Sequence, residues 1–164
     1  MRKAIIASGG LALTTIVIGI FIFFYNGGSF INTSSAAVVV PFTRIVQGDH
    51  SIVATRVNYL ISSTDEFDKL WEMVDASGTP PLVDFNTHAV IAVFAGEQPT
   101  AGYAIEVSQI EDSTERTVSL TLAKPDNDCM EGQVITSPYE IVVVPTTSLP
   151  LTHEDIQTTA NCPK

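Results

Sequence analysis

The chain is poor in basic residues. Its 164 residues include eight Lys and Arg against eighteen Asp and Glu, and Arg2 and Lys3 are two of those eight. The remainder of the chain therefore carries a net charge near −12. Nucleic acids and anionic lipid surfaces attract basic proteins, so this balance argues against both as ligands. The acidic residues are scattered, which is typical of a solvated surface rather than a cation-binding face.

The sequence also lacks the motifs of common catalytic and metal sites. It has no His-Glu-x-x-His pair, no paired-cysteine zinc spacing and no Gly-x-Ser-x-Gly elbow. His50, His88 and His153 stand in unrelated contexts, and residues 153–155 (His-Glu-Asp) are more typical of a solvated segment than of a metal site. Residues 126–128 (Asp-Asn-Asp) lack the ligand spacing of a calcium loop and favour a turn. We therefore expect no metal, no cofactor and no enzymatic activity.

The N-terminal 25 residues differ from the rest. No charged side chain occurs over residues 4–25, and about 20 apolar residues suffice for a helix to span a bilayer. Arg2 and Lys3 precede this run and the next basic residue is Arg44, so the positive-inside rule predicts a cytoplasmic N-terminus and an exported remainder. We expect residues 1–25 to be an uncleaved single-pass anchor in the cell membrane. The alternative is a cleaved signal peptide, whose apolar region usually has only about 7–15 residues.

The exported part divides into three segments. The small and polar residues 26–37 predict a flexible linker, and residues 146–164 predict a polar tail. Residues 38–145 between them predict a small α+β domain, in which an antiparallel sheet of about five strands carries one packed helix. The segments with strand patterning are 38–46, 53–61, 89–95, 117–123 and 134–144, and residues 103–110 form a further strand-like run.

Local sequence features place three of these segments in the sheet. Pro41 interrupts the run 38–46, which therefore predicts an edge strand. Residues 137–138 (Ser-Pro) force a bulge or an edge in the run 134–144. Residues 89–95 are apolar on both faces and should form a central strand.

One helix is expected after the second strand. Ser63 and Glu66 have the spacing of a capping box, and Gly78 with the following prolines ends the helix. An apolar stripe at helical spacing should pack on the sheet. Its members are Phe67, Leu70, Trp71 and Val74. A ligand-stacking role for the tryptophan is the alternative to a role in the core.

Cys129 and Cys162 are the two cysteines of the chain. Two exported cysteines usually pair, so we expect a disulfide between them. This bond would hold the tail 146–164 against the loop 125–132. The alternative is a free nucleophilic Cys129, which needs a nearby histidine base, and the sequence indicates none.

The segment 96–103 is the strongest candidate for a binding loop. It separates the strand-like runs 89–95 and 103–110 and combines a proline with two glycines. Proline fixes one backbone torsion and glycine admits a positive one, so the loop has a defined shape. Rigid loops on β scaffolds often carry binding function. The candidate binding residues are Glu97, Gln98, Pro99, Thr100, Ala101, Gly102 and Tyr103. The alternative is a plain tight turn whose tyrosine packs into the core.

Two segments carry a family resemblance. Residues 90–103 (VIAVFAGEQPTAGY), after a capped helix, and residues 133–142 (QVITSPYEIV), after Cys129, resemble the PrcB-type domain. That domain is the C-terminal module of a protease-complex accessory subunit, and the resemblance covers roughly residues 53–145. It implies a non-catalytic, extracytoplasmic accessory module that stabilises or associates with a secreted protease. The expected partners are the membrane, through residues 4–25, and an exported protease or another envelope protein.

A second resemblance concerns the loop alone. Residues 99–103 (Pro-Thr-Ala-Gly-Tyr) are similar to the Asn-Pro-Thr-Thr-Gly-Tyr loop of chagasin-type cysteine peptidase inhibitors. Gln98 replaces the asparagine and Ala101 replaces the second threonine, and no Arg-Pro-aromatic loop is present. This similarity implies an alternative function as a peptidase inhibitor. A structural envelope protein is the third alternative.

Overall fold

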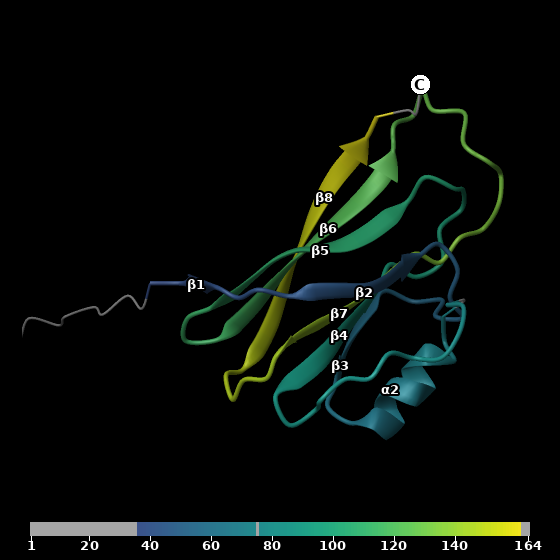
Figure 1. Cartoon of the computed structure of the whole chain (residues 1–164). Coiled ribbons are helices and arrows are strands. Elements are labelled where there is room, and N and C mark those ends of the chain that lie inside the picture. Colours follow the sequence, from purple (N-terminus) through teal and green to yellow (C-terminus); the bar gives the residue numbers. More distant parts are fainter. Residues whose placement is uncertain (1–35, 75, 162–164) are drawn as a thin grey trace, which may run out of the picture. The chain divides into compact units, whose positions relative to one another are not determined.

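A computed structural model describes residues 36–74 and 76–161 of the chain. This part contains eight strands in two four-stranded sheets and one short helix (Figure 1). No helix within it is long and apolar enough to span a bilayer, and the anchor predicted over residues 1–25 lies outside it. The elements are β1 (Val38–Val39), β2 (Thr43–Gly48), β3 (Val57–Ile61), α2 (Thr64–Trp71), β4 (His88–Phe94), β5 (Ala104–Asp112), β6 (Arg116–Pro125), β7 (Tyr139–Pro145) and β8 (Leu151–Ala160).

The two sheets have the strand orders β1-β5-β6-β8 and β2-β7-β4-β3. The expectation of one antiparallel sheet of about five strands in an α+β domain is therefore wrong, because the described residues are mostly β and form two sheets. The single packed helix expected after the second strand is confirmed within these residues. The run 38–46 explains part of the difference, because it divides at Pro41. Its first half pairs with β5 in one sheet and its second half with β7 in the other. Both halves lie at sheet edges, as the proline predicts.

Strand β4 is buried on both faces, as its continuous apolar sequence predicts. Alternate residues Ala89, Ile91 and Val93 belong to a core cluster shared with β5, β6 and β7. The intervening residues Val90, Ala92 and Phe94 belong to a second cluster, which includes the helix. The sheet that contains β4 is thus covered by the other sheet on one face and by α2 on the other.

Helix α2 begins where the capping residues predict. The Ser63 hydroxyl accepts a hydrogen bond from the Glu66 backbone N–H at 3.4 Å, and the Glu66 carboxylate accepts one from the Ser62 backbone N–H at 3.0 Å. The Ser62 N–H is also the main reason that the pKa of Glu66 lies below its ordinary value. The predicted stripe packs into the second cluster, with Phe67 and Leu70 buried and Trp71 half-buried. The indole N–H of Trp71 donates to the Gly78 carbonyl at 3.0 Å.

Two segments differ from the expectation. Within the predicted tail 146–164, residues 151–160 form β8, which pairs with β6 in parallel over ten residue pairs. In the predicted strand 134–144, residues 134–138 form a loop and β7 begins only at Tyr139. β7 is also not an edge strand, because it lies between β2 and β4. Pro138 precedes the ladder, so its missing N–H costs β7 no hydrogen bond.

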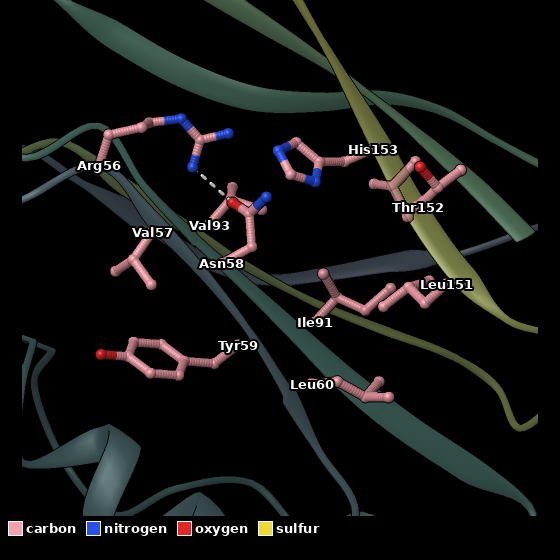
Figure 2. Close-up of a pocket in the computed structure, with 11 residues that line it drawn as sticks. Arg56, Val57, Asn58, Tyr59, Leu60, Ile91, Val93, Leu151, Thr152 and His153 are labelled. Carbon is pink, nitrogen blue, oxygen red and sulfur yellow. Dashed lines mark hydrogen bonds between the residues drawn. The ribbon is translucent and has the colours of Figure 1, made fainter.

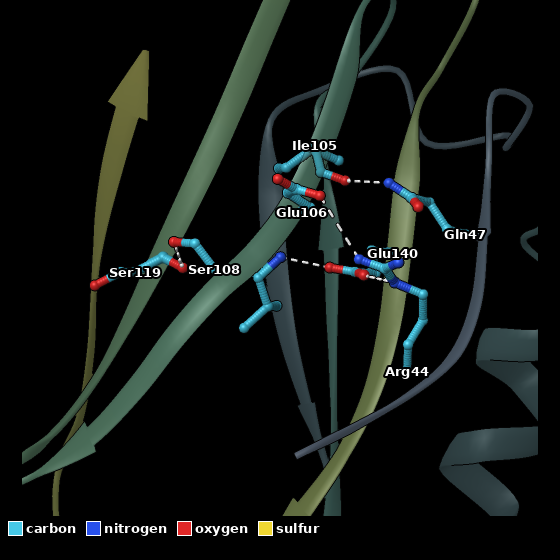
Figure 3. Close-up of polar contacts among 8 residues, drawn as sticks. Arg44, Gln47, Ile105, Glu106, Ser108, Ser119 and Glu140 are labelled. Atoms are coloured by element: carbon cyan, nitrogen blue, oxygen red, sulfur yellow. Dashed lines mark hydrogen bonds and ion pairs between the residues drawn. The ribbon is translucent and has the colours of Figure 1, made fainter. Parts of the chain in front are cut away.

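A buried carboxylate connects the two sheets (Figure 3). The side chain of Glu140 in β7 has no exposed surface. It accepts hydrogen bonds from the backbone N–H of Val107 in β5 and from the guanidinium of Arg44 in β2. Arg44 and Val107 each lie at a shift in the strand register. Such a bulge interrupts the hydrogen bonds between strands, so groups beside it can bind a side chain from elsewhere. Arg44 also lies 3.6 Å from Glu106.

Candidate docking site

The loop between β4 and β5 is fixed near its start, at Gly96. Gly96 has φ +76°, a conformation that residues with a Cβ rarely adopt. A Cβ at this position would lie 2.8 Å from the Thr55 backbone carbon. The next residue, Glu97, donates its N–H to the Ala54 carbonyl at 3.0 Å. The sequence therefore requires glycine here both for the torsion and for the close approach of residues 54–56.

A second loop, between β6 and β7, fixes the remainder. Gln98 and Thr136 exchange two backbone hydrogen bonds, of 2.8 and 3.1 Å. The Thr136 hydroxyl donates to the Thr100 carbonyl at 3.1 Å, and the Ala101 N–H donates to the Gly132 carbonyl at 3.0 Å. We call residues 97–103 and 129–136 together the loop pair. Its backbone is held by its own hydrogen bonds, so it can present side chains without first becoming ordered.

The loop pair exposes several of the predicted residues. Glu97, Pro99 and Gly102 are exposed, while Gln98, Thr100, Ala101 and Tyr103 are half-buried. Tyr103 does not join either core cluster. Its ring lines a cavity of about 240 Å³ with residues that include Gln98, Leu122, Lys124 and Gln157. Tyr103 therefore does not pack into the core, which is where the alternative of a plain tight turn would place it.

The second loop adds apolar surface that the sequence pattern did not predict. Met130 is fully exposed, and Val134 and Ile135 expose about half or more of their surface. The predicted strand 134–144 includes residues 134 and 135, which would be half-buried in a strand. The Ser-Pro dipeptide at 137–138 was the available signal that the strand begins later. Clustered exposed apolar residues beside a rigid loop are typical of a protein-binding surface.

A family comparison covers both loops. Residues 89–145 match the family model described as PrcB C-terminal. This segment is therefore similar to PrcB C-terminal domains. The resemblance seen in the sequence is confirmed over these residues, which run from β4 to β7. Searches of curated proteins and of solved structures found no match, so the chagasin-type similarity of residues 99–103 has no support from them.

The PrcB-type segment holds the whole loop pair but only part of the fold. Strands β4 to β7 supply the centre of one sheet and two strands of the other. β3, α2 and β8 lie outside the matched residues. The loop pair is therefore the exposed part of the segment that matches the PrcB C-terminal model.

The other polar candidates remain separate in space. His50, His88 and His153 are exposed, and within residues 36–74 and 76–161 no three His, Cys, Asp or Glu side chains could hold a metal ion together. Asp126 accepts a hydrogen bond from the Asp128 N–H at 3.2 Å, which closes the predicted turn. Cys129 lies in the second loop, whereas Cys162 lies outside the described residues, so their disulfide stays a prediction.

Proposed function

We propose that this chain is a non-catalytic, membrane-anchored accessory module that docks on an exported protease or its complex through the loop pair. The family of residues 89–145 supports a role in association with a protease complex. The uncharged run 4–25 supports the anchor and the exported location of the domain.

The observation that carries the proposal is the direct pairing of Gln98 with Thr136. This pairing holds the predicted loop beside the exposed apolar side chains of the second loop. A partner therefore meets one surface made from two loops, with Pro99, Met130 and Ile135 as its apolar contacts. Because the loops are already ordered, docking does not require additional loop ordering.

The charge of the surface indicates the chemistry of the partner. Glu97 is exposed and Glu131 is half-exposed, and both flank the apolar contacts in the sequence. Rim charges contribute mainly to association rate and to selection among partners. A complementary surface would therefore be apolar at its centre and basic at its margin.

Site-specific photocrosslinking tests the proposal. The full-length chain is expressed in its native host with a photoreactive amino acid in place of Ile135. After irradiation, the covalent adducts are identified by mass spectrometry. A matched control carries the same group at Leu82, which is fully exposed and apolar but lies outside the loop pair. We expect adducts with subunits of a protease complex from position 135 and none from position 82. Identical adducts from both positions, or none from position 135, would contradict the proposal.

A further inference from the structure

The four sheet edges of the described residues differ in how they are protected against pairing. Natural edge strands are usually blunted by shortness, proline, bulges or charge. β1 has two residues and lies next to Pro41, and β2 has a register shift after Arg44. β8 carries residues 153–155 (His-Glu-Asp). Each of these three edges has at least one protective feature.

β3 has none of these features. Its residues Val57–Ile61 contain no charge and no proline, and they pair with β4 in an unbroken register. Tyr59 is 37% exposed and Leu60 is 54% exposed. A regular, uncharged edge with exposed apolar side chains is a template for another strand.

A cavity of about 420 Å³ lies beside this edge, between β3 and β8 (Figure 2). Apolar residues line it from both sheets, among them Ile91, Val93, Val118 and Leu151. Asn58 and Leu60 face the same side as this cavity, because their β4 partners Val93 and Ile91 belong to the core between the sheets. The guanidinium of Arg56 lies at one end, where it binds the Asp155 carboxylate at 2.7 and 3.1 Å. The cavity is therefore apolar near Ile91 and Leu151 and polar near Arg56, Asn58 and His153, and the guanidinium of Arg56 is already paired.

We propose that β3 pairs with β3 of a second copy of this chain, in an antiparallel arrangement with Tyr59 on the two-fold axis. In this register Asn58 of each copy lies opposite Leu60 of the other, and all five residue pairs are uncharged. The second copy's Leu60 then lies next to Asn58, at the mouth of the cavity. A two-fold symmetric contact uses the same surface twice, as this self-complementary strand allows.

Charge opposes a second copy less at this edge than at the charged surfaces of the chain. The chain carries a net charge of −10, so two copies repel each other over most of their surfaces. Like charges placed directly opposite in a strand pair are destabilising. Residues 57–61 avoid this penalty because they carry no charge, and Arg56 beside them is paired with Asp155. This inference uses residues outside the loop pair and stands or falls independently of the proposed function.

Cysteine crosslinking tests the register. Full-length chains carrying Asn58→Cys and Leu60→Cys are mixed in detergent micelles under mild oxidation, and each variant is also oxidised alone. Directly opposed residues in a strand pair lie close enough for a disulfide, whereas diagonal ones are about 7–8 Å apart. We expect more covalent dimer from the mixture than from either variant alone. Equal yields in all three samples, or a yield no higher than that of the wild-type chain with its native cysteines, would overturn the proposal.

Sedimentation of the full-length chain in density-matched detergent supplies a second measurement. Leu60→Lys places a charge on the edge, and we expect it to raise the dimer dissociation constant by about tenfold. The matched control is Ile156→Lys on the edge strand β8, at a residue that is 46% exposed. We expect this control to dimerise as the wild type does. A monomeric wild type, or equal effects of the two substitutions, would contradict β3 pairing.

Discussion

Gln98 and Thr136 lie opposite each other in two different loops and exchange backbone hydrogen bonds of 2.8 and 3.1 Å. This isolated bridge joins a loop that follows the central strand β4 to a loop that precedes β7. The two loops therefore form one surface, although 37 residues, which include β5 and β6, separate Gln98 from Thr136 in the sequence.

Thr136→Val should loosen the loop pair. The substitution removes the hydroxyl that donates to the Thr100 carbonyl at 3.1 Å, in a side chain that is buried. The loss of one such bond costs about 1 kcal/mol, so the amide of Ala101 should exchange about fivefold faster with deuterium. The control is Thr121→Val, because Thr121 lies in the middle of β6 and away from the loops. Equal exchange rates at Ala101 in both variants would contradict the prediction.

Gly96→Ala should destabilise the fold more than Gly78→Ala. Both glycines have positive φ, +76° and +84°, and that torsion costs an alanine about 1 kcal/mol or more. A Cβ at Gly96 also meets the Thr55 backbone at 2.8 Å, whereas none of the atoms around Gly78 lies within 4 Å of such a Cβ. We expect the free energy of unfolding to fall by about 1 kcal/mol for Gly78→Ala and by at least about 2 kcal/mol for Gly96→Ala. Urea unfolding followed by the fluorescence of Trp71 measures both values.

Glu140→Ala should weaken the connection between the sheets. The substitution leaves the Val107 N–H without its acceptor inside the protein and removes the buried one of the two carboxylates that contact Arg44. We expect a loss of about 3 kcal/mol in the free energy of unfolding. Glu106→Ala is the control, since Glu106 is about half exposed and its contact with Arg44 is longer; it should cost less than about 1 kcal/mol. Similar losses for the two variants would show that the buried carboxylate has no special role.

Asp112→Asn should destabilise the β5–β6 hairpin in a pH-dependent way. Two hydrogen bonds from the Arg116 guanidinium, at 2.7 and 2.8 Å, hold the pKa of Asp112 below its ordinary value of 3.8. Because the pKa is lower in the folded state, the ionised carboxylate stabilises the protein above the unfolded pKa, and this stabilisation is lost as the pH falls through the folded pKa.

At pH 7 the variant should therefore be less stable than the wild type, by about 1–2 kcal/mol. The difference should shrink as the pH falls below about 4, where the unfolded carboxyl begins to take up its proton. Urea unfolding of both proteins between pH 7 and pH 3 checks this. A difference that stays constant over that range would contradict the role assigned to the charge.

The sequence predicts those parts of the fold that depend on local pattern. The unbroken apolar run around Val90 requires two buried faces, and β4 has them. Ser63, Glu66 and the apolar stripe fix the start and the packed face of α2, because capping and helical spacing act within a few residues. The loop 96–103 could be located for the same reason, since its glycines and proline impose a backbone shape locally.

Other parts depend on contacts that no local pattern reports. β8 contains few large apolar residues and forms because its backbone pairs with β6, which is distant in the chain. Met130 and Ile135 are exposed in the loop that pairs with Gln98 through Thr136, whereas apolar residues in a sequence suggest burial. The division of the chain into two sheets depends on how residues around Pro41 pass from one sheet to the other.

The most direct test of the loop pair as a docking surface compares Met130→Arg with Leu82→Arg. Both residues are fully exposed and apolar, and only Met130 belongs to the loop pair. The tagged full-length variants are expressed in the native host, and the amount of protease subunit that co-purifies with each variant is measured. We expect Met130→Arg to reduce the captured amount by about tenfold or more, as the loss of an interface anchor does, and Leu82→Arg to capture as much as the wild type. Equal capture by the two variants would contradict docking through these loops.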